Sequence, residues 1–297
     1  MTIIKPLEFE VLQNLAKKDE TPLWDKEVSY KNNEKVQFKG FVWVSASDED
    51  THEEPDVYFD KWVKFAPINE NAFFDDELNT QTKCDKAWSV KLKVDGVFDT
   101  LAFLNLDVSK IKIETLDGKI IYEKSMYYKK SRTWWEYFFS KFKVNKEDFV
   151  FLPYPINSEI LISFEPAKIG CNVGHILIGK KEFAGVTIYP ANSTYINYSK
   201  TSTNEWGVTN VVTGKKAKYL EFIVAVEKKD FDYYDDLIAG LYNTKALFIG
   251  DESELGFKKL TTFGILKDYS APLEDQDYMQ YKLNIQVCVL IGSLETI

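Results

Sequence analysis

Short runs of alternating apolar and polar residues, with almost no helical spacing, place the tightest limit on how this chain can fold. In the run WSVKLKV, residues 88–94, every second side chain is apolar and the side chains between them are Ser or Lys. Successive side chains of a strand point to opposite faces of a sheet, so this period of two indicates a half-buried strand. The chain is therefore predicted to be mainly β.

The 297 residues are too many for one small core. Changes in composition and in the pattern of apolar and polar residues divide them into three predicted domains, 1–70, 71–180 and 181–297. We expect a multi-domain, mainly β protein. The order would be a small β module, then a β-sandwich or jelly roll, then an α+β domain with one helix on an antiparallel sheet.

The first segment carries a hairpin signal and an acidic run. Strands are predicted at 36–38 and 41–45, with Gly40 in the tight turn between them. The acidic residues between 48 and 56, with His52 among them, are interpreted as a solvated loop.

The middle segment shows repeated strand patterns. Besides 88–94, strands are predicted at 100–106, 110–115, 120–123, 149–152, 159–164 and 175–178, with a turn at Asp117-Gly118. The sequence TWWEYFF at 133–139 is expected to be a short helical or irregular excursion that plugs one end of the sandwich.

The last segment adds one helix to further strands. Asp230 is expected to cap a helix in which Phe231, Tyr234, Leu237, Ile238 and Leu241 share one face. Strands are predicted at 195–203, 207–213, 218–226, 246–249, 260–267 and 281–290, with a hairpin turn at 204–207.

Catalytic residue types are scarce, while aromatic residues make up 15% of the chain. Adjacent acids such as Asp75-Asp76 and Asp235-Asp236 are not placed across a cleft by any motif. His175 lies in an alternating apolar strand, where a structural imidazole is expected. Non-enzymatic binding or assembly is therefore favoured, and a hydrolase with a non-standard site is a third hypothesis.

Charge and cysteine usage limit the partners and the compartment. A net charge of −9 and a pI near 5.0 argue against a nucleic-acid partner. The segment MTIIKPLEFEVL does not resemble a signal peptide, and no apolar run predicts a membrane span. Cys84, Cys171 and Cys288 are odd in number and far apart, so we expect no disulfide, no zinc site and folding in a reducing cytoplasm.

The first segment resembles small carbohydrate-binding modules of the chitin-binding type. The matching residues are Trp24-Asp25, the stretch 30–36, the stretch 40–43 and Trp62, although Asn33-Glu34 stands where these modules have Gly-Asp. The resemblance implies that Trp24, Tyr30, Trp43 and Trp62 stack on sugar rings. The alternative, which we weigh as stronger for each ring, is that these side chains form the core of a small module.

The middle segment resembles the discoidin-like, galactose-binding-like jelly roll. The resemblance rests on residues 74–80, on Trp88 to Leu92, on residues 98–106 and on a closing strand at 175–179. It implies that a structural calcium could be held by Asp75 or Asp76; no other metal and no cofactor are expected.

The order of segments is similar to a group of tailed-bacteriophage virion proteins. The most specific stretches are Trp134–Phe139 and residues 263–270, and further matches are at 185–189, 198–201 and Trp206-Gly207. The resemblance implies a structural component of the tail tip, baseplate or collar, assembled in the host cytoplasm and located in the virion. Other tail proteins, further copies of the chain and a host-surface glycan would be its partners.

The aromatic run at 133–139 is the expected subunit contact. Clustered large rings are typical of interface hot spots, and the residues concerned are Trp134, Trp135, Tyr137, Phe138 and Phe139. The alternative function is a carbohydrate-binding protein that recognises cell-surface polysaccharide through its first two modules.

Overall fold

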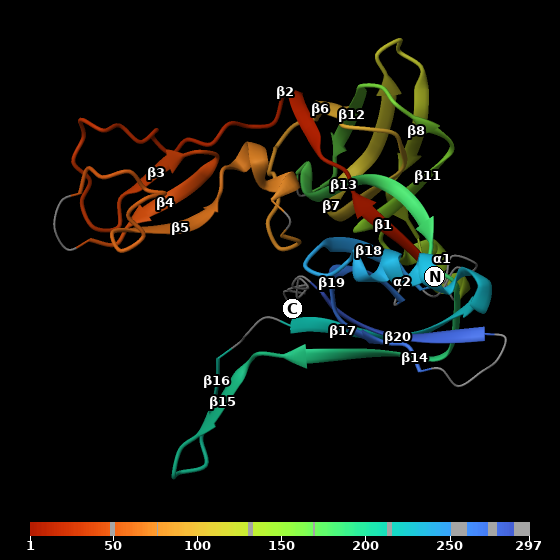
Figure 1. The fold of residues 1–297 in the computed structure, drawn as a ribbon. Coiled ribbons are helices and arrows are strands. Elements are labelled where there is room, and N and C mark those ends of the chain that lie inside the picture. Colours follow the sequence, from red (N-terminus) through yellow and green to blue (C-terminus); the bar gives the residue numbers. More distant parts are fainter. Residues whose placement is uncertain are drawn as a thin grey trace.

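The computed structural model describes residues 1–47, 51–75, 77–129, 133–168, 170–212, 216–250, 260–272 and 278–287. The predicted fold class is confirmed, because the chain is mainly β, with large antiparallel sheets and few helices. Figure 1 shows a small module set to one side of a larger body, and a narrow hairpin that extends away from that body.

The small module is a three-stranded antiparallel sheet. It consists of β3 (Lys35–Phe38), β4 (Phe41–Ser45) and β5 (Trp62–Pro67), in that order. Lys39 and Gly40 both have positive φ (47° and 80°) in the turn between β3 and β4, so the predicted hairpin is confirmed. The 3₁₀ helix η1 (Asn69–Phe74) follows the module and carries the buried side chain of Phe73 into the sandwich core.

The sandwich is built around one long strand. Its strands are β2 (Phe9–Asn14), β6 (Trp88–Val94), β7 (Phe98–Thr115), β8 (Ile120–Ser125), β11 (Glu147–Ile156), β12 (Ile160–Pro166) and β13 (Asn172–Phe183). The first half of β7 pairs with β11 and β13, and its second half pairs with β12 and β8. Side chains from both groups of strands fill one apolar core.

The prediction of separate strands at 100–106 and 110–115 is wrong, because both lie in β7. Asn105 has a φ of 56° within this strand, and the backbone N–H of the next residue, Leu106, donates to the carbonyl of Lys146 at 2.9 Å. A residue in this conformation redirects a strand without ending it. The strand therefore passes from one layer to the other where the sequence suggested a break.

The last unit packs one helix against an antiparallel sheet, as predicted. The helix α2 (Phe231–Ala239) follows the 3₁₀ turn η2 (Lys228–Asp230). The strands are β14 (Val186–Asn197), β17 (Lys216–Glu227), β18 (Lys245–Ile249), β19 (Thr261–Ser270) and β20 (Tyr278–Val287). Leu237, Ile238 and Leu241 are buried in the core between α2 and this sheet.

The predicted cap of α2 is wrong in detail. Asp230 stands at the N-cap position, but its side chain accepts no hydrogen bond from the helix and its φ and ψ are −104° and 7°. The preceding turn η2 already continues into the helix, so Asp230 lacks the extended backbone that a capping side chain requires.

Strand β1 (Thr2–Pro6) joins the sandwich to the last unit. It pairs with β13 on one side and with β18 on the other, so one sheet runs through both units. Ile3 enters the core around α2, whereas Ile4 enters a separate cluster with Leu177 of β13 and Phe263 of β19. The division into three domains stays a prediction. At the junction between the sandwich and the last unit, the side chains of β1 are themselves buried in apolar clusters.

Two smaller strand pairs lie outside this sheet. Strands β9 (Tyr127–Tyr128) and β10 (Lys143–Val144) form a short hairpin that carries α1 (Trp134–Phe139). Strands β15 (Lys200–Thr203) and β16 (Thr209–Val212) form the narrow hairpin of Figure 1. Gly207, with a φ of 77°, donates its N–H to the carbonyl of Asn204, and this confirms the predicted turn at 204–207.

Candidate functional site

Helix α1 presents its aromatic residues outward because of where it begins. The Thr133 hydroxyl accepts a hydrogen bond from the backbone N–H of Glu136 at 3.2 Å and caps the helix. Successive residues of an α-helix are rotated by about 100° around the helix axis. The five rings therefore cover an arc of about 200° around α1, and Glu136 lies on the opposite side. Glu136 is half-buried, whereas every ring is exposed, so the helix rests with its one carboxylate toward the rest of the chain.

The five rings of α1 contact one another and no core. Their exposed fractions run from 55% for Tyr137 to 80% for Trp134. The rings of Trp135 and Phe139 are 4.0 Å apart, and Trp134 stacks on Phe138 at 6.4 Å. The expectation that this run plugs the sandwich is therefore wrong. The hairpin β9–β10 carries the helix beyond the core cluster, which contains none of these residues.

The base of this hairpin extends the aromatic surface. The ammonium group of Lys129 lies 5.5 Å from the ring centre of Tyr137 and 5.7 Å from that of Phe142, within cation–π range. Phe142 is exposed and contacts Tyr127 at 6.5 Å. We define the aromatic surface as the five rings of α1 together with Phe142. The predicted contact ended at residue 139 and did not include Phe142, although Phe142 is the sixth aromatic ring within residues 134–142.

The rings proposed to stack on sugars have a different environment. Tyr30, Trp43 and Trp62 are buried and form the core of the small module with Val36. Trp62, only 1% exposed, donates its indole N–H to the carbonyl of Glu53 at 2.9 Å. Their faces are covered by the module itself, so they offer no surface on which a sugar could stack.

Trp24 is the exception among the four rings. It is partly buried and meets the ring of Phe38 edge-on at 5.2 Å. The structure therefore brings all four residues together, with three of them buried in a core and Trp24 packed against it, which is the alternative weighed above as stronger.

Part of the acidic run, which was interpreted as a solvated loop, forms hydrogen bonds and ion pairs with the small module. Glu53 accepts hydrogen bonds from Lys61 at 2.6 Å and from the hydroxyl of Thr51. These two bonds lower the pKa of Glu53 to about 2. Asp56 pairs with Lys39 at 2.5 Å, so this segment is tied to both ends of the module's sheet. Residues 48–50 lie outside the described part of the chain.

Asp75, one of the two residues considered for calcium, has other partners. Asp75 accepts hydrogen bonds from the hydroxyl of Thr80 at 2.5 Å and from the backbone N–H of Glu77 at 2.9 Å. Asp76 lies outside the described residues. Among the residues that the structure does describe, no group of three His, Cys, Asp or Glu side chains is placed to hold a metal ion.

The cysteines that the structure describes are buried free thiols. Cys84 and Cys171 both lie in the sandwich core. Burial raises the pKa of Cys171 to about 12, so it remains a thiol at neutral pH and is a poor nucleophile. Cys288 lies outside the described residues.

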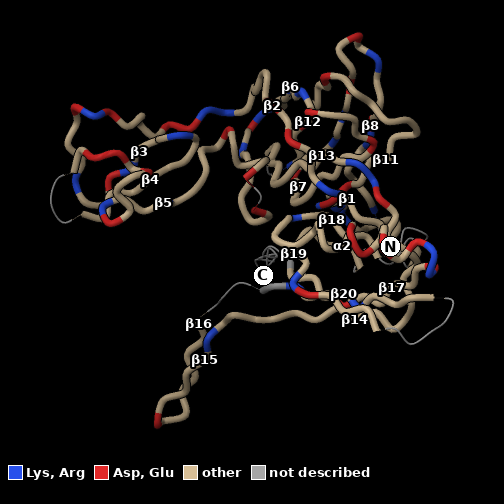
Figure 2. The backbone as a smooth tube through the Cα atoms, viewed as in Figure 1, with Lys and Arg blue, Asp and Glu red and all other residues tan. Residues whose placement is uncertain are grey.

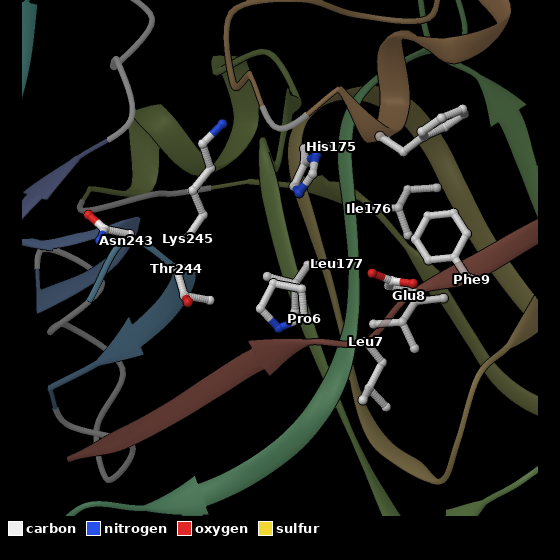
Figure 3. Close-up of a pocket in the computed structure, with 12 residues that line it drawn as sticks. Pro6, Leu7, Glu8, Phe9, His175, Ile176, Leu177, Asn243, Thr244 and Lys245 are labelled. Atoms are coloured by element: carbon white, nitrogen blue, oxygen red, sulfur yellow. The ribbon is translucent and has the colours of Figure 1, made fainter. Parts of the chain in front are cut away.

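A pocket of about 590 Å³ lies at the junction beside β1 and β13 (Figure 3). Its titratable lining residues are Glu8, His175 and Lys245, and Figure 3 shows that their side chains do not converge on one point. His175 is buried, with its ring 4.9 Å from that of Phe263. Acid–base chemistry needs groups within hydrogen-bond reach of one reacting atom, and this lining does not provide that arrangement.

The sequence argument also missed the surface of β14 and of the β15–β16 hairpin. Between Glu182 and Lys215 the only charged side chains are Lys200 and Glu205, although 28% of all residues are charged. Figure 2 shows this segment as an almost uncharged stretch of backbone. The low local charge was readable from the sequence, but its meaning depends on knowing that the segment is exposed.

Among the described residues, no helix is long and apolar enough to cross a membrane. Comparison with known proteins finds no protein-family model that matches the chain and no curated protein with significant similarity to it. The argument for function therefore rests on the exposed surfaces of the chain itself.

Proposed function

We propose that this chain is a non-enzymatic structural component of a bacteriophage tail, in the tail tip, baseplate or collar, that joins neighbouring virion proteins. In this proposal it is assembled in the host cytoplasm, and some of its copies contact the host surface. The sequence resemblance to virion proteins supplies the setting, and the exposed surfaces supply the physical support.

The exposure of all five rings of α1 is the observation that carries the proposal. An isolated exposed apolar residue is ordinary, but a contiguous exposed group of Trp, Tyr and Phe is typical of a protein-binding surface. Such rings bury large apolar areas at low entropic cost, which is why they dominate interface hot spots. A partner that covers the aromatic surface would bury the rings that are exposed in the chain alone.

The rest of the molecule suits a scaffold. Its cores are apolar and built from long paired strands, and the two cysteines that the structure describes are buried in one of them. Rigid β units present preformed surfaces, and repetition of weak contacts around a symmetric particle makes them collectively strong.

The test is to locate the chain in assembled particles. Gold-labelled antibody against the chain should mark the tails of purified virions in electron micrographs. A chain that stays in the host lysate and is absent from the particles contradicts the proposal.

A variant experiment tests the role of α1. The double change Trp135→Ala and Phe138→Ala should reduce incorporation into particles at least tenfold while the circular dichroism of the purified chain stays unchanged. Phe59→Ala, at another exposed ring on the small module, is the matched control and should leave incorporation unchanged.

A further inference from the structure

Strand β14 is at one edge of the large sheet, where it pairs with β17, and the β15–β16 hairpin continues beyond its end as a separate two-stranded sheet. Strand β14 pairs with β17 from Val186 to Asn197, and the chain then continues into β15, the turn at 204–207, and β16. We call residues 186–212 the charge-poor ribbon. It contains only Lys200 and Glu205 as charged residues.

Much of the charge-poor ribbon is exposed, although Ala191 packs against the core around α2 and the hydroxyl of Thr187 donates to the carbonyl of Gly250. In the described part of the chain, β14 pairs with β17 alone, and β15 and β16 pair only with each other. Large side chains along it are exposed, with Trp206 at the tip at 87%; the others are Val186, Tyr189, Tyr195, Ile196, Tyr198, Val208, Val211 and Val212.

An uncovered edge of this composition is unusual for a surface that remains in water. The β15–β16 part is a two-stranded hairpin, and such a hairpin without a packed face is marginally stable by itself. Natural proteins protect free edges with charged residues, above all Lys, or with Pro. Here Pro190 removes one backbone donor in the first half of β14, but residues 192–197 carry neither protection. This second half of β14 is therefore the stretch best suited to pairing with another strand.

The distribution of charge indicates what covers the charge-poor ribbon. Two copies of a chain with a net charge of −9 repel each other over most of their surfaces. The charge-poor ribbon is the long exposed segment where two copies can meet without bringing like charges together. A strongly charged partner, by contrast, would find no complementary charges there.

We propose that the charge-poor ribbon is a self-association surface, at which residues 192–197 of β14 pair antiparallel with the same residues of a second copy. Residues beyond 197 of one copy then run alongside the first half of β14 of the other copy, so each hairpin covers the exposed side chains of Val186 and Tyr189 of the other copy. This geometry is two-fold and closes on itself, as most homodimers do. The inference deepens the proposed assembly function and rests on it.

The exposed rings are sufficient to anchor such a contact. Four aromatic side chains of the ribbon are more than half exposed: Tyr189, Tyr195, Tyr198 and Trp206. Aromatic side chains bury roughly 150–250 Å² each. With the valines they supply a surface on the scale of the roughly 800 Å² that each partner gives to an interface of standard size.

Sedimentation equilibrium of the full chain over a range of concentrations tests the proposal. The wild-type chain should self-associate into dimers. Introducing a charge next to the two-fold axis, as Thr194→Asp, should raise the dissociation constant at least tenfold, because the two copies then bring like charges together, and Thr194→Lys should do the same. Thr194 is exposed, so the fold should not change.

A mixture of the two charged variants provides the decisive measurement. If identical ribbons face each other, the Asp variant and the Lys variant should form a mixed dimer at least as tight as the wild type. Val97→Asp, at an exposed valine outside the ribbon, is the matched control and should associate as the wild type does.

Three results would overturn the inference. These are a wild-type chain that stays monomeric at all concentrations, charged variants that associate as well as the wild type, and a mixture that stays monomeric. If the chain alone is monomeric but the ribbon variants are lost from virions, a different tail protein covers the ribbon. Whether the wild-type chain is present in virion tails is measured separately, with the gold-labelled antibody. This inference can therefore fail while the proposed function stands.

Discussion

Individual aromatic side chains in this protein serve opposite purposes, and burial separates them. Trp43 and Trp62 are almost fully covered, and their indole N–H groups donate to backbone carbonyls within the small module. Trp134 and Trp206 are largely exposed. A buried ring stabilises its own module, whereas an exposed ring is available to a partner. The same residue type therefore predicts opposite effects of substitution.

Replacing a buried ring should unfold the small module. Trp43→Ala is expected to lower the free energy of unfolding by about 3–5 kcal/mol, because it removes a large buried side chain and leaves a cavity. Trp206→Ala, a matched change at an exposed site, should alter it by less than about 0.5 kcal/mol. Urea unfolding followed by circular dichroism measures both, and equal effects would contradict the assignment of Trp43 to the core.

Glu53 should make the stability of the small module depend on pH. Its hydrogen bonds with Lys61 and Thr51 lower its pKa to about 2, well below the usual value of a glutamate. A group with a lowered folded-state pKa contributes stability above its unfolded pKa and loses that contribution as the pH falls through its folded pKa. The contribution of Glu53 should therefore be present above about pH 5 and be lost by about pH 2.

The comparison of the wild type with Glu53→Gln isolates this effect. The difference in unfolding midpoint between the two chains should be largest near neutral pH and should disappear toward pH 2. A difference that is constant with pH would show that the carboxylate charge is not what stabilises the acidic loop.

At the scale of elements, the conformation of single residues decides where strands go. Asn105 keeps β7 continuous while changing its partners, and its side-chain amide donates to the carbonyl of Leu78 at 2.8 Å. Its backbone and side-chain oxygens both accept from Gln81. This position therefore combines a positive φ with three hydrogen bonds, and few residue types satisfy both requirements.

Asn105→Val should destabilise the sandwich by about 2–4 kcal/mol, because a β-branched residue strains a positive φ and the side-chain bonds are lost. Asn105→Gly should cost less, since glycine adopts the conformation freely and only the bonds are lost. Chemical denaturation of the two variants tests the ranking. If glycine is as harmful as valine, the backbone conformation is not the decisive factor.

At the scale of the whole molecule, β1 links parts of the chain that are far apart in sequence. Ile3 and Ile4 are fully buried and point into two different clusters, one around α2 and one between β13 and β19. Because β1 also pairs with β13 and β18, it contributes to both units through hydrogen bonds and through packing.

Ile4→Ala should lower stability by about 2–5 kcal/mol and should expose sites in both the sandwich and the last unit to protease. Ile120→Ala, at an exposed position on β8, is the matched control and should leave the digestion pattern unchanged. Cleavage confined to one unit would show that β1 does not couple the two.

The sequence by itself determined the mainly β class, most strand positions and the buried face of α2, because periods of two and of 3.6 are local properties of a chain. It also located the aromatic run of α1. Only the tertiary structure decided that this run is exposed, that Tyr30, Trp43 and Trp62 form a core, and that β7 is one strand. Burial and strand partners depend on residues far away in sequence, and a local pattern carries no information about them. The same limit applies to the charge-poor ribbon, whose composition is visible in the sequence but whose free edge exists only in the folded sheet.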